Sequence, residues 1–194
     1  MKRCKPAAKV LAMVVLAAVG VWALTAAAGR PAAAGAASIE RGAYLVNLGG
    51  CDDCHSPKMM TAQGPVPDPA RLLSGQPAEE KLAPVPAGLF GPDKWGGLCN
   101  NHLSAWVGPW GTSFASNLTP DKETGIGTWD EQFFVRVLRT GKYMGAGRPI
   151  LPPMPWQSFA KLTDDDLRSI FAYLKSLKPV RNRVPEAVPA GRAH

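Results

Sequence analysis

The stretch Cys51-Asp52-Asp53-Cys54-His55 decides how the rest of this chain is interpreted, because it sets two thiols and an imidazole at Cys-x-x-Cys-His spacing. Covalent attachment of a c-type haem requires this spacing, since the two sulfurs add across two vinyl groups on one edge of the porphyrin. The adjacent His55 is then held beneath the iron as its proximal ligand. The motif occurs once in 194 residues. The sequence therefore predicts one covalently bound haem c, held by Cys51, Cys54 and His55.

Two other interpretations of Cys-x-x-Cys remain open, half of a zinc site and a dithiol redox pair. A zinc site needs four ligands. The further candidates are few and scattered: Cys99, His102, His194 and the remote Cys4. Cys99 has no exported cysteine left to pair with once the haem has consumed Cys51 and Cys54, and we expect a half-buried, unreactive thiol there.

Residues 1–37 predict a signal peptide or an N-terminal membrane anchor followed by an Ala-rich linker. A basic start precedes an apolar run over residues 10–28, and small residues that suit cleavage come next. The run is just long enough to span a bilayer, so an uncleaved chain would contact the membrane through residues 10–28. Either outcome places the remainder in the periplasm, soluble after cleavage or anchored to the inner membrane.

Most of the net positive charge of the chain comes from residues 1–37, so it says little about the remaining residues. Five of the 22 basic residues lie within residues 1–37, which leaves 17 basic against 15 acidic residues. No basic stripe with interleaved aromatic residues appears, so we expect no nucleic-acid partner. What remains is a modest cationic group near the C-terminus, made of Lys175, Lys178, Arg181 and Arg183.

Residues 38–184 have the length of one domain, and three helices can be predicted within them, over residues 39–48, 129–140 and 164–177. Residues that start or stop helices flank each one: Gly49 for the first, Thr128, Glu131 and Gly141 for the second, Thr163 and Pro179 for the third. Residues 57–128 are rich in Pro and Gly without a sustained period, which predicts a long ordered loop insertion. Residues 185–194 are predicted to form a flexible tail.

The chain resembles the class I cytochromes c, through Cys51-x-x-Cys54-His55 after a short helix and Ala172-Tyr173-Leu174-Lys175 in the last helix. This resemblance implies an all-α fold, the class I cytochrome c fold, with helices packed around one covalent haem and a long Pro/Gly-rich loop insertion.

A closer resemblance covers about residues 38–184. It is to bacterial monohaem modules related to the cytochrome subunits of membrane-bound alcohol and gluconate dehydrogenases. The matching segments are Ser116-Asn117-Leu118-Thr119-Pro120-Asp121, Thr124-Gly125-Ile126-Gly127-Thr128-Trp129, Arg139-Thr140-Gly141 and Pro152-Pro153-Met154-Pro155-Trp156. Those subunits have three haem motifs where this chain has one.

The sixth iron ligand must come from the opposite side of the porphyrin and from far along the chain. Met59 and Met60 follow His55 too closely to reach that side. Met144 and Met154 are both distant enough, but Met154 lies between prolines that would hold a loop rigid, and it matches the ligand position of the family. A bis-His iron would need His102 instead.

The sequence thus predicts a periplasmic electron carrier rather than an enzyme, with His55 and Met154 as iron ligands. Its partners would be redox proteins, a dehydrogenase or a terminal oxidase, and the chain would serve as an electron-transfer subunit in the first case. Two alternatives are a peroxidase-like haem enzyme and a haem-based ligand sensor, each of which needs an open or labile sixth position.

Overall fold

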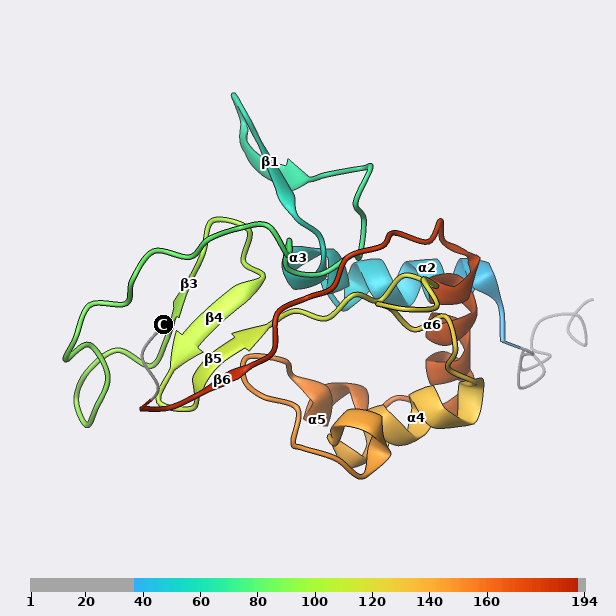
Figure 1. Ribbon diagram of the computed structural model, residues 1–194. Coiled ribbons are helices and arrows are strands. Elements are labelled where there is room, and N and C mark those ends of the chain that lie inside the picture. The colour runs from blue at the N-terminus through green and yellow to red at the C-terminus, as the bar shows by residue number, and fades with distance from the viewer. Residues whose placement is uncertain (1–36, 192–194) are drawn as a thin grey trace, which may run out of the picture. The chain divides into compact units, whose positions relative to one another are not determined.

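The structure is a computed structural model that describes residues 37–191. The predicted export segment or anchor, residues 1–37, lies outside the described residues except for Ala37. Within residues 37–191 the chain forms a set of short helices: α2 (Ile39–Leu48), α3 (Cys51–His55), α4 (Glu131–Thr140), the 3-10 helix η1 (Tyr143–Gly145), α5 (Trp156–Phe159) and α6 (Asp164–Ser176). Figure 1 shows α3 and α5 at opposite ends of the arc made by α2, α6 and α4.

The expectation of an all-α fold is wrong, because the described residues also form two antiparallel sheets, and the fold mixes α and β structure. One sheet pairs β1 (Lys58–Thr61) with β2 (Gly64–Pro67). The other has the order β3 (Leu98–Cys99), β4 (Ala105–Gly108), β5 (Gly111–Phe114) and β6 (Val188–Pro189). Five of these strands lie in the predicted loop insertion. They have at most four residues each, which is too short for an alternating pattern to show in the sequence.

Two residues of the predicted flexible tail, residues 185–194, belong to the larger sheet. Val188 and Pro189 form β6, which pairs with Thr112 and Gly111 of β5. Gly111 has φ 99°, and a Cβ there would lie 2.1 Å from the carbonyl oxygen of Val188. The close approach of the two backbones therefore requires glycine at this position.

The three predicted helices are present, with one shifted start. Ser38 caps α2 by accepting a hydrogen bond from the Arg41 amide, and Thr163 caps α6 in the same way. The helix expected from Trp129 begins at Glu131, because the side chain of Asp130 accepts from the Phe133 amide and acts as the N-cap in place of Thr128.

The core lies where α2 crosses α6. A Cβ on Gly42 would stand 1.9 Å from the carbonyl oxygen of Ser169, so only glycine lets the two helices approach this closely. Apolar side chains from α2, α4, α6 and two connecting segments complete the core: Leu45, Val46, Leu73, Ile126, Phe134, Leu138, Leu167, Ile170, Phe171 and Leu174.

The chain after α6 returns across the molecule, and residues 180–182 form what we call the C-terminal strap. The buried Asn117 donates from Nδ2 to the Val180 carbonyl at 2.8 Å. Asn182 donates to the carbonyls of Ser74 and Gln76 at 2.7 and 2.8 Å. The strap thus joins the segment that contains Asn117 to the segment that follows the Cys-x-x-Cys-His helix.

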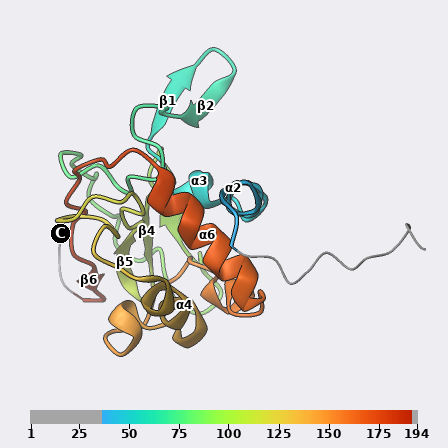
Figure 2. The same cartoon turned by 90° about the vertical axis from the view of Figure 1, so that its right-hand side faces the viewer.

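The β1–β2 hairpin projects from the rest of the described residues (Figure 2). It carries exposed apolar side chains, among them Met60 at 73% exposure. Pro65 and Pro67 of β2 have no amide hydrogen, which limits further strand pairing at this edge. None of the helices formed by residues 37–191 has the length and apolar character needed to cross a membrane.

Candidate haem-binding site

His55, the last residue of α3, is fixed in one tautomer. Its Nδ1 lies 2.7 Å from the carbonyl oxygen of Ser116. A carbonyl only accepts hydrogen bonds, so Nδ1 carries the proton and donates it. Nε2 is then left with its lone pair, which is the state in which histidine binds a metal. Burial lowers the pKa of His55, which also favours the neutral ring that a ligand must have.

Cys51 and Cys54 stand three residues apart on the five-residue helix α3, so their side chains share one face. Both are half-buried. Burial, assisted by the charge of Asp52, raises the pKa of Cys51 to about 12, and burial also raises the pKa of Cys54. A dithiol redox pair needs a thiol with a lowered pKa. The arrangement therefore does not fit a dithiol active site.

Backbone contacts hold α3 at both ends. Gly50, which precedes the helix, has φ 63°, a left-handed conformation that suits glycine. The hydroxyl of the buried Ser56 donates to Asp52 Oδ1 at 2.7 Å and accepts from the Leu73 amide at 2.8 Å. The Gly75 amide donates to the His55 carbonyl at 2.7 Å. These contacts anchor the proximal side of the site to the segment that contains Leu73 and Gly75.

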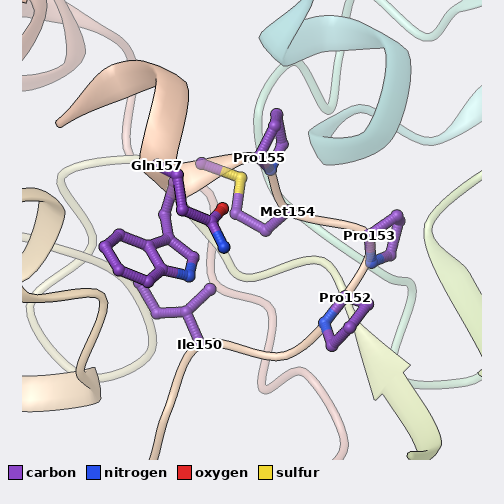
Figure 3. Close-up of a pocket in the computed structure, with 7 residues that line it drawn as sticks. Ile150, Pro152, Pro153, Met154, Pro155 and Gln157 are labelled. Atoms are coloured by element: carbon purple, nitrogen blue, oxygen red, sulfur yellow. The ribbon is translucent and has the colours of Figure 1, made fainter. Parts of the chain in front are cut away.

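Met154 differs from the other methionines within residues 37–191 in its burial. It is half-buried, packs against the core, and lines an opening of about 200 Å³ together with Ile150, Pro152, Pro153, Pro155, Trp156 and Gln157 (Figure 3). Met144, by contrast, is 53% exposed on η1, while Met59 and Met60 are exposed on the hairpin. Burial and core packing thus separate Met154 from Met144, and the role of Met154 as an iron ligand stays a prediction.

The larger sheet braces the loop that carries Met154. The hydroxyl of Ser113, on β5, donates to the Pro152 carbonyl at 2.5 Å, and it accepts a hydrogen bond from Trp110 Nε1 at 3.3 Å. On the other side of the loop, the Ile150 amide donates to the Gly141 carbonyl at 2.8 Å. A β-strand that the sequence did not reveal is therefore part of the Met154 side of the site.

Gly141 and Trp156 complete this support. Gly141 ends α4 with φ 62°, and a Cβ there would lie 2.3 Å from Cε2 of Trp156. The indole covers the end of α4 only because residue 141 has no side chain.

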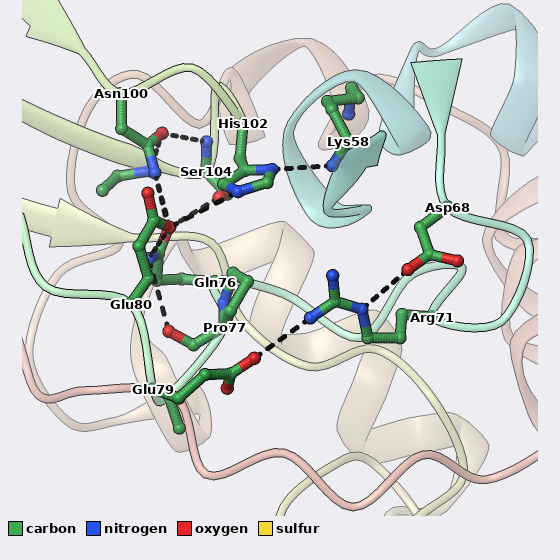
Figure 4. Close-up of polar contacts among 12 residues, drawn as sticks. Lys58, Asp68, Arg71, Gln76, Pro77, Glu79, Glu80, Asn100, His102 and Ser104 are labelled. Atoms are coloured by element: carbon green, nitrogen blue, oxygen red, sulfur yellow. Dashed lines mark hydrogen bonds and ion pairs between the residues drawn. The ribbon is translucent and has the colours of Figure 1, made fainter. Parts of the chain in front are cut away.

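His102 is engaged in a polar cluster, which we define as Gln76, Glu80, Asn100, His102 and Ser104 (Figure 4). Its Nδ1 accepts from the Lys58 amide at 2.8 Å, and its Nε2 lies 3.8 Å from Glu80 Oε2. Both ring nitrogens therefore have neighbours in the protein, and the structure does not favour the bis-His alternative. Gln76 and Ser104 have no exposed surface, and they share a 2.7 Å hydrogen bond.

Sequence reasoning missed this polar cluster, because its members are spread over residues 76–104 with no recognisable spacing.

Two smaller expectations, on Cys99 and on the cationic group near the C-terminus, also change. Cys99 is exposed on β3 rather than half-buried. In the cationic group near the C-terminus, Lys175 donates to the Gly127 carbonyl at 2.5 Å and Arg181 pairs with Glu123 at 2.8 Å, so half of that group is engaged within the protein.

The residues present fit a haem c. Two half-buried thiols share one helix face with a histidine whose Nε2 retains its lone pair, and a half-buried thioether comes from the distant loop before α5. Leu118, Trp129 and Phe159 are further half-buried side chains at the border of the core. Within residues 37–191, no group of three or more His, Cys, Asp or Glu side chains could hold a metal ion.

Comparisons with known proteins agree with this chemistry. No protein-family model matches the chain. It is 31% identical over 173 residues to the alcohol dehydrogenase (quinone) cytochrome c subunit of Gluconobacter oxydans, covering 88% of this chain and 28% of that protein. It is also 31% identical over 137 residues to the gluconate 2-dehydrogenase cytochrome c subunit of Pantoea cypripedii, covering 71% of this chain and 22% of that protein.

A shorter match is to the fructose dehydrogenase cytochrome subunit of Gluconobacter japonicus. There the identity is 37% over 73 residues, which cover 37% of this chain and 15% of that protein. The chain thus spans less than a third of the length of each of these relatives.

Proposed function

This chain is a c-type cytochrome related to the cytochrome c subunits of bacterial alcohol, gluconate and fructose dehydrogenases, and from that premise we propose that it carries single electrons between redox proteins. One haem c, joined covalently to Cys51 and Cys54, would supply the one-electron iron couple. The observation that carries the proposal is the His55 tautomer, in which the hydrogen bond to Ser116 leaves Nε2 as a ligand.

The chain's own residues would keep the coordination constant through the cycle. The ring of His55 cannot turn without breaking its 2.7 Å hydrogen bond to the Ser116 carbonyl, and a second 2.7 Å hydrogen bond, from the Gly75 amide to the His55 carbonyl, holds the backbone. Met154 lies between two prolines, whose backbone angles are restricted. Ser113 adds a tether to the same loop. Little rearrangement between oxidation states is what electron transfer requires, and a rigid sixth ligand distinguishes a carrier from a peroxidase or a ligand sensor.

A dehydrogenase is the redox partner that the relatives support best, because three of them are named as cytochrome subunits of dehydrogenases. In such an assembly this chain would accept electrons from a catalytic subunit and pass them on, without itself acting on the organic substrate. A terminal oxidase would be an electron acceptor. We place this activity in the periplasm, on the strength of the export-type composition of residues 1–37.

The proposal is tested first by haem content and ligation. Pyridine haemochrome analysis of the purified protein should find one haem per chain that acidic acetone does not extract. The oxidised protein should show a weak sulfur-to-iron charge-transfer band in the far red. Met154→Ala should abolish that band and leave the haem attached, while the matched variant Met144→Ala should retain it. Two haems per chain, or a band unaffected by Met154→Ala, would refute the assignment.

A further inference from the structure

Lys58 is an unusual residue in this structure, because it is only 9% exposed. Buried lysines are rare unless a partner compensates the charge. Here the ammonium donates hydrogen bonds to three backbone carbonyls, those of Asp52 at 2.7 Å, Asp53 at 3.0 Å and Ser56 at 2.6 Å. The compensating groups are thus carbonyl dipoles of the haem-attachment segment itself.

These carbonyls lie in α3 and directly after it. The last carbonyls of a helix have no partner within the helix, and they carry partial negative charge. The Asp52 carbonyl also accepts from the Ser56 amide at 3.3 Å, whereas Lys58 is the donor that the structure shows for the carbonyls of Asp53 and Ser56. Its ammonium also supplies the opposite charge. The carbonyls of Asp52 and Asp53 lie between Cys51 and Cys54, so the ammonium stands beside the segment that would hold the porphyrin.

The backbone of Lys58 is also fixed. Its amide donates to His102 Nδ1 at 2.8 Å, which joins Lys58 to the polar cluster (Figure 4). Burial lowers the pKa of Lys58, and the charge of Asp53 opposes that effect. Three carbonyl acceptors within 3.0 Å of Nζ match the three N–H donors of a charged ammonium.

We propose that Lys58 is a positioning residue for the haem couple, one that holds the end of the Cys51–His55 helix and raises the reduction potential through its fixed positive charge. This inference rests on the proposed function, since it presumes a haem at Cys51, Cys54 and His55. A fixed cation favours the iron state with one positive charge fewer, which is Fe(II). Removing it would also take the ammonium donor away from the carbonyls of Asp53 and Ser56, and the partial negative charge of those oxygens favours Fe(III). Both effects act in the same direction.

The test uses the holoprotein and its reduction potential, measured by redox titration at neutral pH. Lys58→Met removes the charge and keeps the length of the side chain. It should shift the Fe(II)/Fe(III) ratio at a given potential by about tenfold toward Fe(III), which is a fall of about 59 mV for one electron. Lys58→Arg keeps the charge and should stay close to the wild-type potential.

Lys175→Met is the matched control. Lys175 also donates to backbone carbonyls, those of Ile126 and Gly127, but these lie outside the haem motif. This variant loses a comparable set of contacts and should leave the potential unchanged. If Lys58→Met does not assemble, Lys58→Gln replaces it, because its amide can still donate to a carbonyl while carrying no charge.

The outcomes separate the inference from the proposed function. A Lys58→Met or Lys58→Gln protein with full haem content, an intact far-red band and the wild-type potential would overturn the role of Lys58 alone. An equal fall in Lys175→Met would also overturn it, because the effect would then be general. Absence of haem, or of the far-red band, in the wild-type protein would instead overturn the proposed function.

Discussion

Replacing Ser113 with alanine should loosen the Met154 loop without unfolding the protein. The hydroxyl makes a 2.5 Å hydrogen bond to the Pro152 carbonyl, two residues before Met154. Such a bond contributes about 1 kcal/mol net, and Pro152 is exposed, so water can replace the lost partner in part. If this contact exists only when the loop is closed, its loss raises the population of the open loop roughly fivefold.

Binding of carbon monoxide to the reduced protein provides the assay. Carbon monoxide binds only after Met154 has left the iron, so at low gas concentration the observed rate is proportional to the population of the open loop. Ser113→Ala should bind carbon monoxide about fivefold faster than wild type, in line with about 1 kcal/mol. The control is Ser176→Ala, which removes a hydroxyl that donates to the Tyr173 carbonyl at 2.7 Å within α6. Equal rates in wild type and Ser113→Ala would refute the idea that the sheet braces the loop.

Three further predictions concern packing, acid stability and export. Gly42→Ala should destabilise the protein by about 3 kcal/mol or more in chemical unfolding, because its Cβ would meet the Ser169 carbonyl at 1.9 Å; a loss below about 1 kcal/mol would contradict the close α2–α6 contact. A hydrogen bond from Arg71 holds the pKa of Asp68 below its usual value, so its contribution to the free energy of unfolding is present above about pH 4 and is lost as the pH falls further. Asp68→Asn should therefore flatten the stability profile between about pH 5 and pH 3, to about the same degree as Arg71→Met. The intact mass of the exported protein should match a start between Gly29 and Ser38 plus one haem, whereas a mass that includes Met1 in the membrane fraction would establish an anchored form.

The helices could be predicted because their signals are local. Gly49 was expected to end the first helix and Thr163 to begin the last, and the structure uses them as C-cap and N-cap. The start of the second helix was predicted too early. Thr128 and Glu131 have the spacing of a capping box, but Asp130 also has a side chain that can cap, and the structure uses Asp130. Two capping residues so close together leave the start of a helix undetermined, and only the tertiary setting decides between them.

The sheets could not be predicted, because short strands depend on partners that lie elsewhere in the chain. β6 has two residues, and it becomes a strand only through pairing with β5 about 75 positions earlier.

At the candidate site, the Cys-x-x-Cys-His spacing identified α3 as the attachment segment, and the flanking prolines singled out Met154 among the methionines. Nothing in the sequence identified Ser116 or Ser113 as supports, since the first acts through a backbone carbonyl that every residue type has.

The C-terminal strap gives this molecule an order of assembly. The Ser116 carbonyl orients His55, and the neighbouring Asn117 is tied to Val180, 63 positions later. Asn182 reaches Ser74 across 108 positions. A chain made from its N-terminus can therefore complete the support of His55 only when nearly all of the described residues have been synthesised, and contacts of such long range form late. Until those contacts form, the attachment segment would remain accessible to a large planar molecule, and the fold would close around it in its last step.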